Sequence, residues 1–103
     1  MTELCDLTAL EARQKIGSKD ISPVELLESC ITRIDTINPA VNSVVTSCYD
    51  RAREEAAMAQ KKVMSGEPLG LLHGLPFGAK DLEATGQVRT TMGSKLYENN
   101  VPA

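Results

Sequence analysis

A helix start at Ser22 constrains the fold of this chain more than any other feature of its sequence. The Ser22 hydroxyl can accept a hydrogen bond from a first-turn N–H, Glu25 can return one to the cap, and Pro23 has the backbone angle of a first helical residue. The positions that follow at steps of three and four are Leu27, Ile31, Ile34 and Asn38. This spacing predicts an amphipathic helix over 23–37, ended by Asn38-Pro39.

Two further helices are expected on either side of this one. Thr8 and Glu11 form a second capping box, which predicts a helix over 9–16 with Gly17 placed to stop it. A third helix is predicted over 49–64, because acidic residues come first and lysines last, an order that complements the helix dipole. One face of this helix is lined with alanines, which let another element approach closely.

Two short segments have the composition of strands. Residues 42–47 are rich in β-branched side chains, and residues 75–80 form an apolar run that ends in a lysine.

Length and charge exclude several classes of protein. With 103 residues the chain holds one domain at most. Eleven Lys and Arg against 14 Asp and Glu leave a net charge of -3, so nucleic acid is not an expected partner. The sequence has no secretory signal and no apolar run that could span a bilayer, so a cytoplasmic protein without a membrane partner is expected.

The metal-ligating residue types are too sparse to form a recognisable site. Cys5, Cys30 and Cys48 are widely spaced and form no C-x-x-C pair, so they are interpreted as ordinary thiols. His73 is the single histidine and lacks the second group that site chemistry normally requires. Neither a metal nor a cofactor is expected.

The segment LGLLHGLPFGAKD, residues 69–81, is the most informative part of the chain. Glycines recur every fourth residue at Gly66, Gly70, Gly74 and Gly78. A phosphate-binding loop needs four residues between its glycines, then Lys, then Ser or Thr. Here three residues separate the last two glycines, Ala79 precedes Lys80, and Asp81 follows, so that motif is excluded.

Lys80 then has two interpretations. A lysine at the end of an apolar strand commonly extends its charged group into water. Alternatively, a partly desolvated lysine can act as a general base. Alternation along a strand would place Asp81 on the opposite side from Lys80. The physics of the sequence alone leaves both interpretations open.

Two motifs in order favour the second interpretation. Residues 72–81 read LHGLPFGAKD, and residues 90–94 read TTMGS. This combination resembles the amidase signature family, whose members have a strand of the type H-G-apolar-P-x-x-x-K-D followed by a T-T-x-G-S loop. Similarity extends upstream to the Ser22 helix start and the turn at residues 66–70.

The resemblance implies an α/β fold around a mixed sheet and hydrolysis of a small-molecule carboxamide by a serine, a second serine with a cis peptide bond, and a lysine. Lys80 matches that lysine. The family's glycine- and serine-rich segment, which holds both serines, has no counterpart in residues 1–103. The chain is therefore interpreted as the N-terminal portion of one amidase domain, inactive by itself. These motifs specify neither the amide nor an oligomeric state.

Two alternatives stand beside this interpretation. Ser94 follows a glycine in the second motif, but it has no partner histidine and fits no nucleophile elbow, so a role in the loop or substrate wall is favoured. The whole chain could instead be a non-catalytic remnant that acts as an interaction module.

Overall fold

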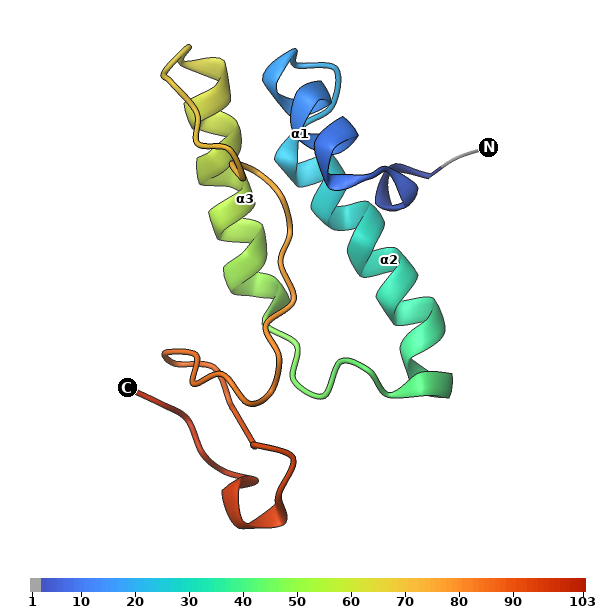
Figure 1. Cartoon of the computed structure of the whole chain (residues 1–103), viewed down its shortest axis with the longest axis vertical. Coiled ribbons are helices and arrows are strands. Elements are labelled where there is room, and N and C mark those ends of the chain that lie inside the picture. Colours follow the sequence, from blue (N-terminus) through green and yellow to red (C-terminus); the bar gives the residue numbers. More distant parts are fainter. Residues whose placement is uncertain (1–2) are drawn as a thin grey trace.

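The computed structural model describes residues 3–103, which form helices joined by irregular segments (Figure 1). The elements follow in the order η1 (Leu4–Asp6), α1 (Ala9–Gly17), α2 (Pro23–Val41), α3 (Tyr49–Met64) and η2 (Lys95–Tyr97), where η denotes a 3-10 helix. The three α-helices lie close to their predicted spans. Among the described residues, no helix has the length and apolar character needed to cross a bilayer.

Hydrogen bonds confirm the capping box predicted at the start of α1 and one of the two bonds predicted at the start of α2. At the start of α1, Glu11 N–H donates to Thr8 Oγ1 (3.2 Å) and the Glu11 carboxylate accepts from Thr8 N–H (3.0 Å). The bond from the Thr8 backbone, aided by the Thr8 side chain, holds the pKa of the Glu11 carboxyl below its usual value. At the start of α2, Glu25 N–H donates to Ser22 Oγ (3.0 Å) and Pro23 is the first helical residue, but the expected return bond from the Glu25 side chain to the Ser22 backbone is not observed among the described residues.

The end of α2 lies beyond its predicted position. The helix continues through Pro39 to Val41, so the prediction that Asn38-Pro39 ends it is wrong. Pro39 lies in the last turn, where its missing N–H costs a single backbone bond. The helix ends at Asn42, which adopts the left-handed conformation (φ 48°) and donates its N–H to the Asn38 carbonyl (2.7 Å).

Residues 42–47 do not form the predicted strand. The Asn38 side chain binds both backbone polar groups of Val44, because Asn38 Nδ2 donates to the Val44 carbonyl (2.9 Å) and Asn38 Oδ1 accepts from Val44 N–H (2.9 Å). A strand would offer these groups to a neighbouring backbone. The segment is instead a turn closed by a side chain of the preceding helix.

The predicted strand over 75–80 is also absent. A strand requires a second backbone with which to form a ladder. Within residues 3–103, no backbone hydrogen bond joins residues 76–80 to a distant segment, and Leu75 N–H bonds back to the Leu72 carbonyl (3.2 Å). The part of the chain that the structure describes is therefore helical, and the predicted α/β sheet is not observed in it.

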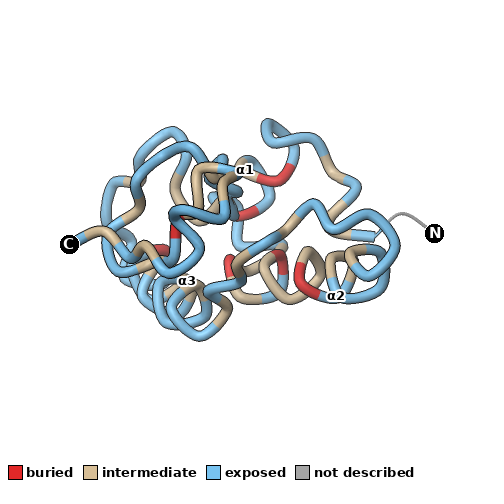
Figure 2. Tube along the Cα trace, turned by 90° about the horizontal axis from the view of Figure 1, so that it is seen from below, coloured by how far each residue is buried: buried red, intermediate tan, exposed pale blue. Residues whose placement is uncertain are grey.

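The core is small and lies where the three helices meet (Figure 2). α3 packs along α2, and the ion pair between Arg53 and Glu28 (2.6 Å) joins the two helices. Leu69 and Leu75, in the segment after α3, pack against this core from outside the helices. The buried apolar residues of the cluster are Ala12, Ile16, Leu26 and Val63.

Candidate functional site

The turn at His73-Gly74 anchors the motif segment to the helices. Gly74 adopts a positive φ (82°), and a methyl group on its Cα would lie 2.9 Å from Pro23 Cγ and 3.2 Å from Ile16 Cδ1. His73 Nε2 lies 2.9 Å from the carbonyl oxygen of Ala59 in α3. The paired histidine and glycine thus hold the chain against α1, α2 and α3, which is a structural role.

Lys80 lies beyond this anchor, in an exposed irregular segment. Its carbonyl accepts a hydrogen bond from Glu83 N–H (2.9 Å), so the chain turns directly after it. Among the described residues, its ammonium group makes no hydrogen bond or ion pair. The space beside Gly78 is also open, since a methyl group there would meet no atom within 4 Å.

Asp81 joins the first motif to the second. Its Oδ1 accepts a hydrogen bond from Thr91 N–H (2.8 Å), its Oδ2 accepts one from the Thr91 hydroxyl, and its carbonyl accepts one from Met92 N–H (2.9 Å). The Thr91 side chain and backbone, in that order, are the main causes that lower the pKa of the Asp81 carboxyl. Because residues 75–80 do not form a strand, strand alternation does not place the Asp81 side chain, and its position is set by the hydrogen bonds to Thr91.

The neighbouring Thr90 is buried and binds Asn100 near the end of the loop. Thr90 is buried, with 2% of its surface exposed, and its hydroxyl donates to the Val88 carbonyl (3.0 Å). Its backbone N–H donates to the Asn100 carbonyl (2.9 Å), and Asn100 Nδ2 donates back to the Thr90 carbonyl (2.9 Å). Thr91 therefore binds Asp81, and Thr90 binds Asn100.

Ser94 has a structural role in this loop. Its Oγ accepts a hydrogen bond from Leu96 N–H (3.2 Å) and caps η2, while its own N–H donates to the Thr91 carbonyl (3.0 Å). This geometry agrees with a role in the loop.

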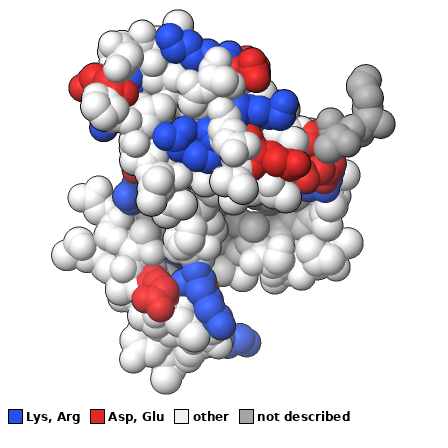
Figure 3. All heavy atoms as spheres, turned by 45° about the horizontal axis from the view of Figure 1, so that its top comes forward, with Lys and Arg blue, Asp and Glu red and all other residues white. Residues whose placement is uncertain are grey.

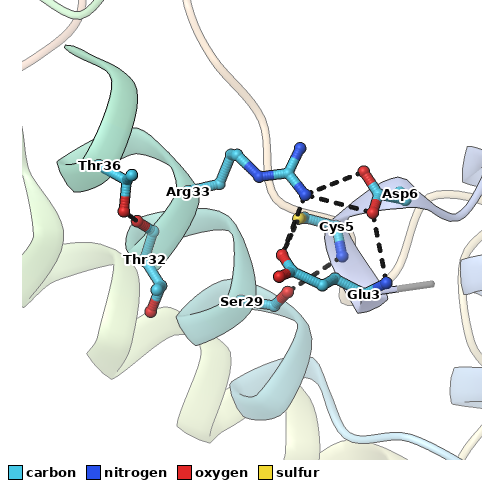
Figure 4. A network of polar contacts seen from close by, with 7 residues as sticks. All are labelled: Glu3, Cys5, Asp6, Ser29, Thr32, Arg33 and Thr36. Carbon is cyan, nitrogen blue, oxygen red and sulfur yellow. Dashed lines mark hydrogen bonds and ion pairs between the residues drawn. The ribbon is translucent and has the colours of Figure 1, made fainter. Parts of the chain in front are cut away.

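A second polar cluster, which the sequence patterns did not indicate, lies at η1 (Figure 4). Glu3, Cys5 and Asp6 bring ligand-type atoms within 4.8 Å of one another. Arg33 on α2 forms ion pairs with both carboxylates, at 2.9 Å to Glu3 and 3.1 Å to Asp6. Cys5 N–H also donates to Ser29 Oγ (3.1 Å), so this cluster docks η1 on α2. No sequence motif links these residues, because the contact spans a gap of about thirty positions along the chain.

The three cysteines are free thiols, as expected from their spacing. Burial raises the pKa of the Cys30 thiol, and the nearby Cys5 adds to the effect. This favours the neutral, unreactive form of Cys30.

Comparison with known proteins gives one consistent result. The family model described as Amidase matches residues 25–103. A glutamyl-tRNA(Gln) amidotransferase subunit of Granulibacter bethesdensis is 40% identical over 102 residues, which cover 99% of this chain and 20% of that protein. The acylamidase of Rhodococcus erythropolis is 37% identical over 95 residues, which cover 92% of this chain and 20% of that protein.

A solved structure agrees with these relatives. The crystal structure of a bacterial aryl acylamidase of the amidase signature enzymes matches with a TM-score of 0.88 at 37% identity, over 94% of this chain and 20% of that one. The chain spans about a fifth of the length of the relatives that it matches.

Proposed function

This chain belongs to the amidase signature family, and from that premise we propose that it contributes the catalytic base, Lys80, to an enzyme that hydrolyses a small-molecule carboxamide. The observation that supports the proposal is the pair of hydrogen bonds between Asp81 and Thr91, which joins the two motifs. Lys80 lies one residue from that link and is exposed, and its ammonium group makes no hydrogen bond or ion pair within residues 3–103. Its amine is therefore open to groups from the rest of the domain.

The chemistry of an amide explains why a base is needed. A serine hydroxyl is a weak nucleophile, and the departing amine requires a proton. In the proposed step, neutral Lys80 removes the serine proton through the second serine while the serine oxygen bonds to the carbonyl carbon. The carbon–nitrogen bond then breaks, and the same proton passes to the departing nitrogen. Water hydrolyses the resulting ester and regenerates the serine.

The proposal assigns both serines to the remaining length of the family domain. Residues 1–103 contain no Gly-Gly-Ser-Ser run, and by themselves they are expected to hydrolyse no amide. A lysine acts as a base only in its neutral form, which burial favours. Because Lys80 is exposed among the described residues, the rest of the domain must supply that burial.

A hybrid enzyme tests the role of Lys80. Residues 1–103 replace the matching segment of the Rhodococcus erythropolis acylamidase, and hydrolysis of a chromogenic acyl anilide is followed across the pH range. Lys80→Ala should lower kcat by about 100-fold or more, the effect typical of losing a general base. Lys95→Ala is the matched control, because Lys95 is also exposed and lies in η2, and it should retain the activity of the hybrid.

A folded Lys80→Ala hybrid that keeps the full turnover across the pH range would refute this proposal. Lys80 would then be a solvated surface lysine, and the alternative of a non-catalytic interaction module would be favoured. An open reading frame that continues past Ala103 into a glycine- and serine-rich segment would favour the enzyme instead.

A further inference from the structure

Asp81 is the fixed point of the segment that contains Lys80. Between residues 76 and 84, Asp81 is half-buried and all the remaining residues are exposed. Among the described residues, the hydrogen bonds that this segment makes to distant parts of the chain all belong to Asp81, and they reach Thr91 and Met92. Without these bonds, the segment would be held only at its two ends, by Leu75, which packs on the helical core, and by Thr85, whose N–H donates to Thr90 Oγ1 (3.3 Å).

The lowered pKa of the Asp81 carboxyl keeps it ionised and able to accept the hydrogen bonds from Thr91. Donation by the Thr91 hydroxyl and N–H holds the pKa of the Asp81 carboxyl below its usual value of 3.8, and the Gly93 N–H and the charge of Arg89 add to this. A carboxyl with a lowered pKa contributes its stabilisation above its ordinary pKa and loses it only as pH falls through the lowered value. The hydrogen bonds between Asp81 and Thr91 therefore persist throughout the pH range in which a lysine can be neutral.

We propose that Asp81 is a positioning residue, which holds the backbone at Lys80 in its working place by binding Thr91. This inference rests on the proposed function of Lys80. Asp81 is not a catalytic residue, because its carboxylate is occupied by Thr91. It acts through the peptide bond that joins it to Lys80. A misplacement of about 1 Å at a reacting group can cost about 100-fold in rate, so a single attachment can control the activity of the site.

The same hybrid enzyme tests this inference. Asp81→Ala removes both side-chain bonds and should lower kcat by roughly 100-fold while KM stays within about twofold. Thr91→Val removes only the hydroxyl and should lower kcat by about 10-fold, whereas Thr91→Ser keeps the hydroxyl and should restore most of the rate. Glu83→Ala is the control, because the exposed Glu83 is a nearby carboxylate whose side chain forms no hydrogen bond or ion pair among residues 3–103.

A purely structural role of Asp81 has a different signature. Its loss would then lower the thermal midpoint, while kcat per folded molecule would stay at the level of the hybrid, and that result would overturn the inference. If Asp81→Ala does not fold, the comparison of Thr91→Val with Thr91→Ser decides, and equal kcat values for the two would also overturn it.

The outcomes separate this inference from the proposed function. An inactive Lys80→Ala together with a fully active Thr91→Val would leave Lys80 as the base and remove Asp81 from the mechanism. A fully active Lys80→Ala hybrid would refute the proposed roles of both Lys80 and Asp81.

Discussion

Any side chain in place of Gly74 would destabilise the fold for two separate reasons. Its positive φ costs an L-residue about 1–2 kcal/mol, and crowding against Pro23 and Ile16 adds about 1–3 kcal/mol of overpacking. Gly74→Ala in the hybrid enzyme should therefore lower the free energy of unfolding by about 2–5 kcal/mol, as measured by chemical denaturation. The turn before Lys80 depends on this glycine.

Substitutions at two other glycines measure the backbone and packing contributions separately. Gly66 has a positive φ (76°) and open space around it, so Gly66→Ala should show the backbone cost alone. Gly70 has open space and no positive φ, so Gly70→Ala should change stability little. If Gly74→Ala is no more destabilising than Gly66→Ala, the close packing on Pro23 and Ile16 does not contribute.

At the scale of elements, Asn38 determines how α2 passes into α3. Its side chain makes two hydrogen bonds to Val44, each worth about 0.5–1.5 kcal/mol. Asn38→Ala should lower the free energy of unfolding by about 1–3 kcal/mol in the same denaturation experiment. Asn38→Asp keeps the acceptor for Val44 N–H and loses the donor, so its effect should be intermediate.

Ser43→Ala is the control for this connection, because the Ser43 hydroxyl reaches Asn38 Oδ1 only at 3.5 Å. It should leave stability nearly unchanged. An Asn38→Ala variant as stable as Ser43→Ala would show that the turn at residues 42–47 is held by other contacts.

The described chain as a whole is more open than a compact domain of its length. Its radius of gyration is 15.1 Å, against about 13 Å for a globular chain of about 100 residues. Most of the charged side chains on the face in Figure 3 lie in its upper half, an uncharged band lies below them, and a smaller charged group lies lower still. Large apolar side chains are exposed in the second half of the chain, and Leu71, Phe77 and Leu96 are at least 90% exposed.

Residues 1–103 produced alone should therefore be marginally stable and should self-associate, because exposed apolar area favours association. We expect a broad thermal transition whose midpoint depends on protein concentration, and increased fluorescence of a hydrophobic dye. Sedimentation and calorimetry over a range of concentrations check this. A sharp, concentration-independent transition of a monomer would contradict it, and slow amide exchange in residues 75–79 would do so as well.

The sequence by itself determined the starts of α1 and α2, because the Thr8 capping box and the Ser22 cap with Pro23 each act within one turn of chain. It also placed Lys80 in a recognisable motif, although no structural observation tests the lysine's role. Local composition favoured strands at 42–47 and 75–80, but a strand forms only when a second backbone pairs with it. Among the described residues, the Asn38 side chain binds the backbone of Val44, and residues 76–80 make no backbone hydrogen bond to a distant segment. Tertiary structure alone decided that Asp81 meets Thr91, since residues ten positions apart are brought together by the path of the chain.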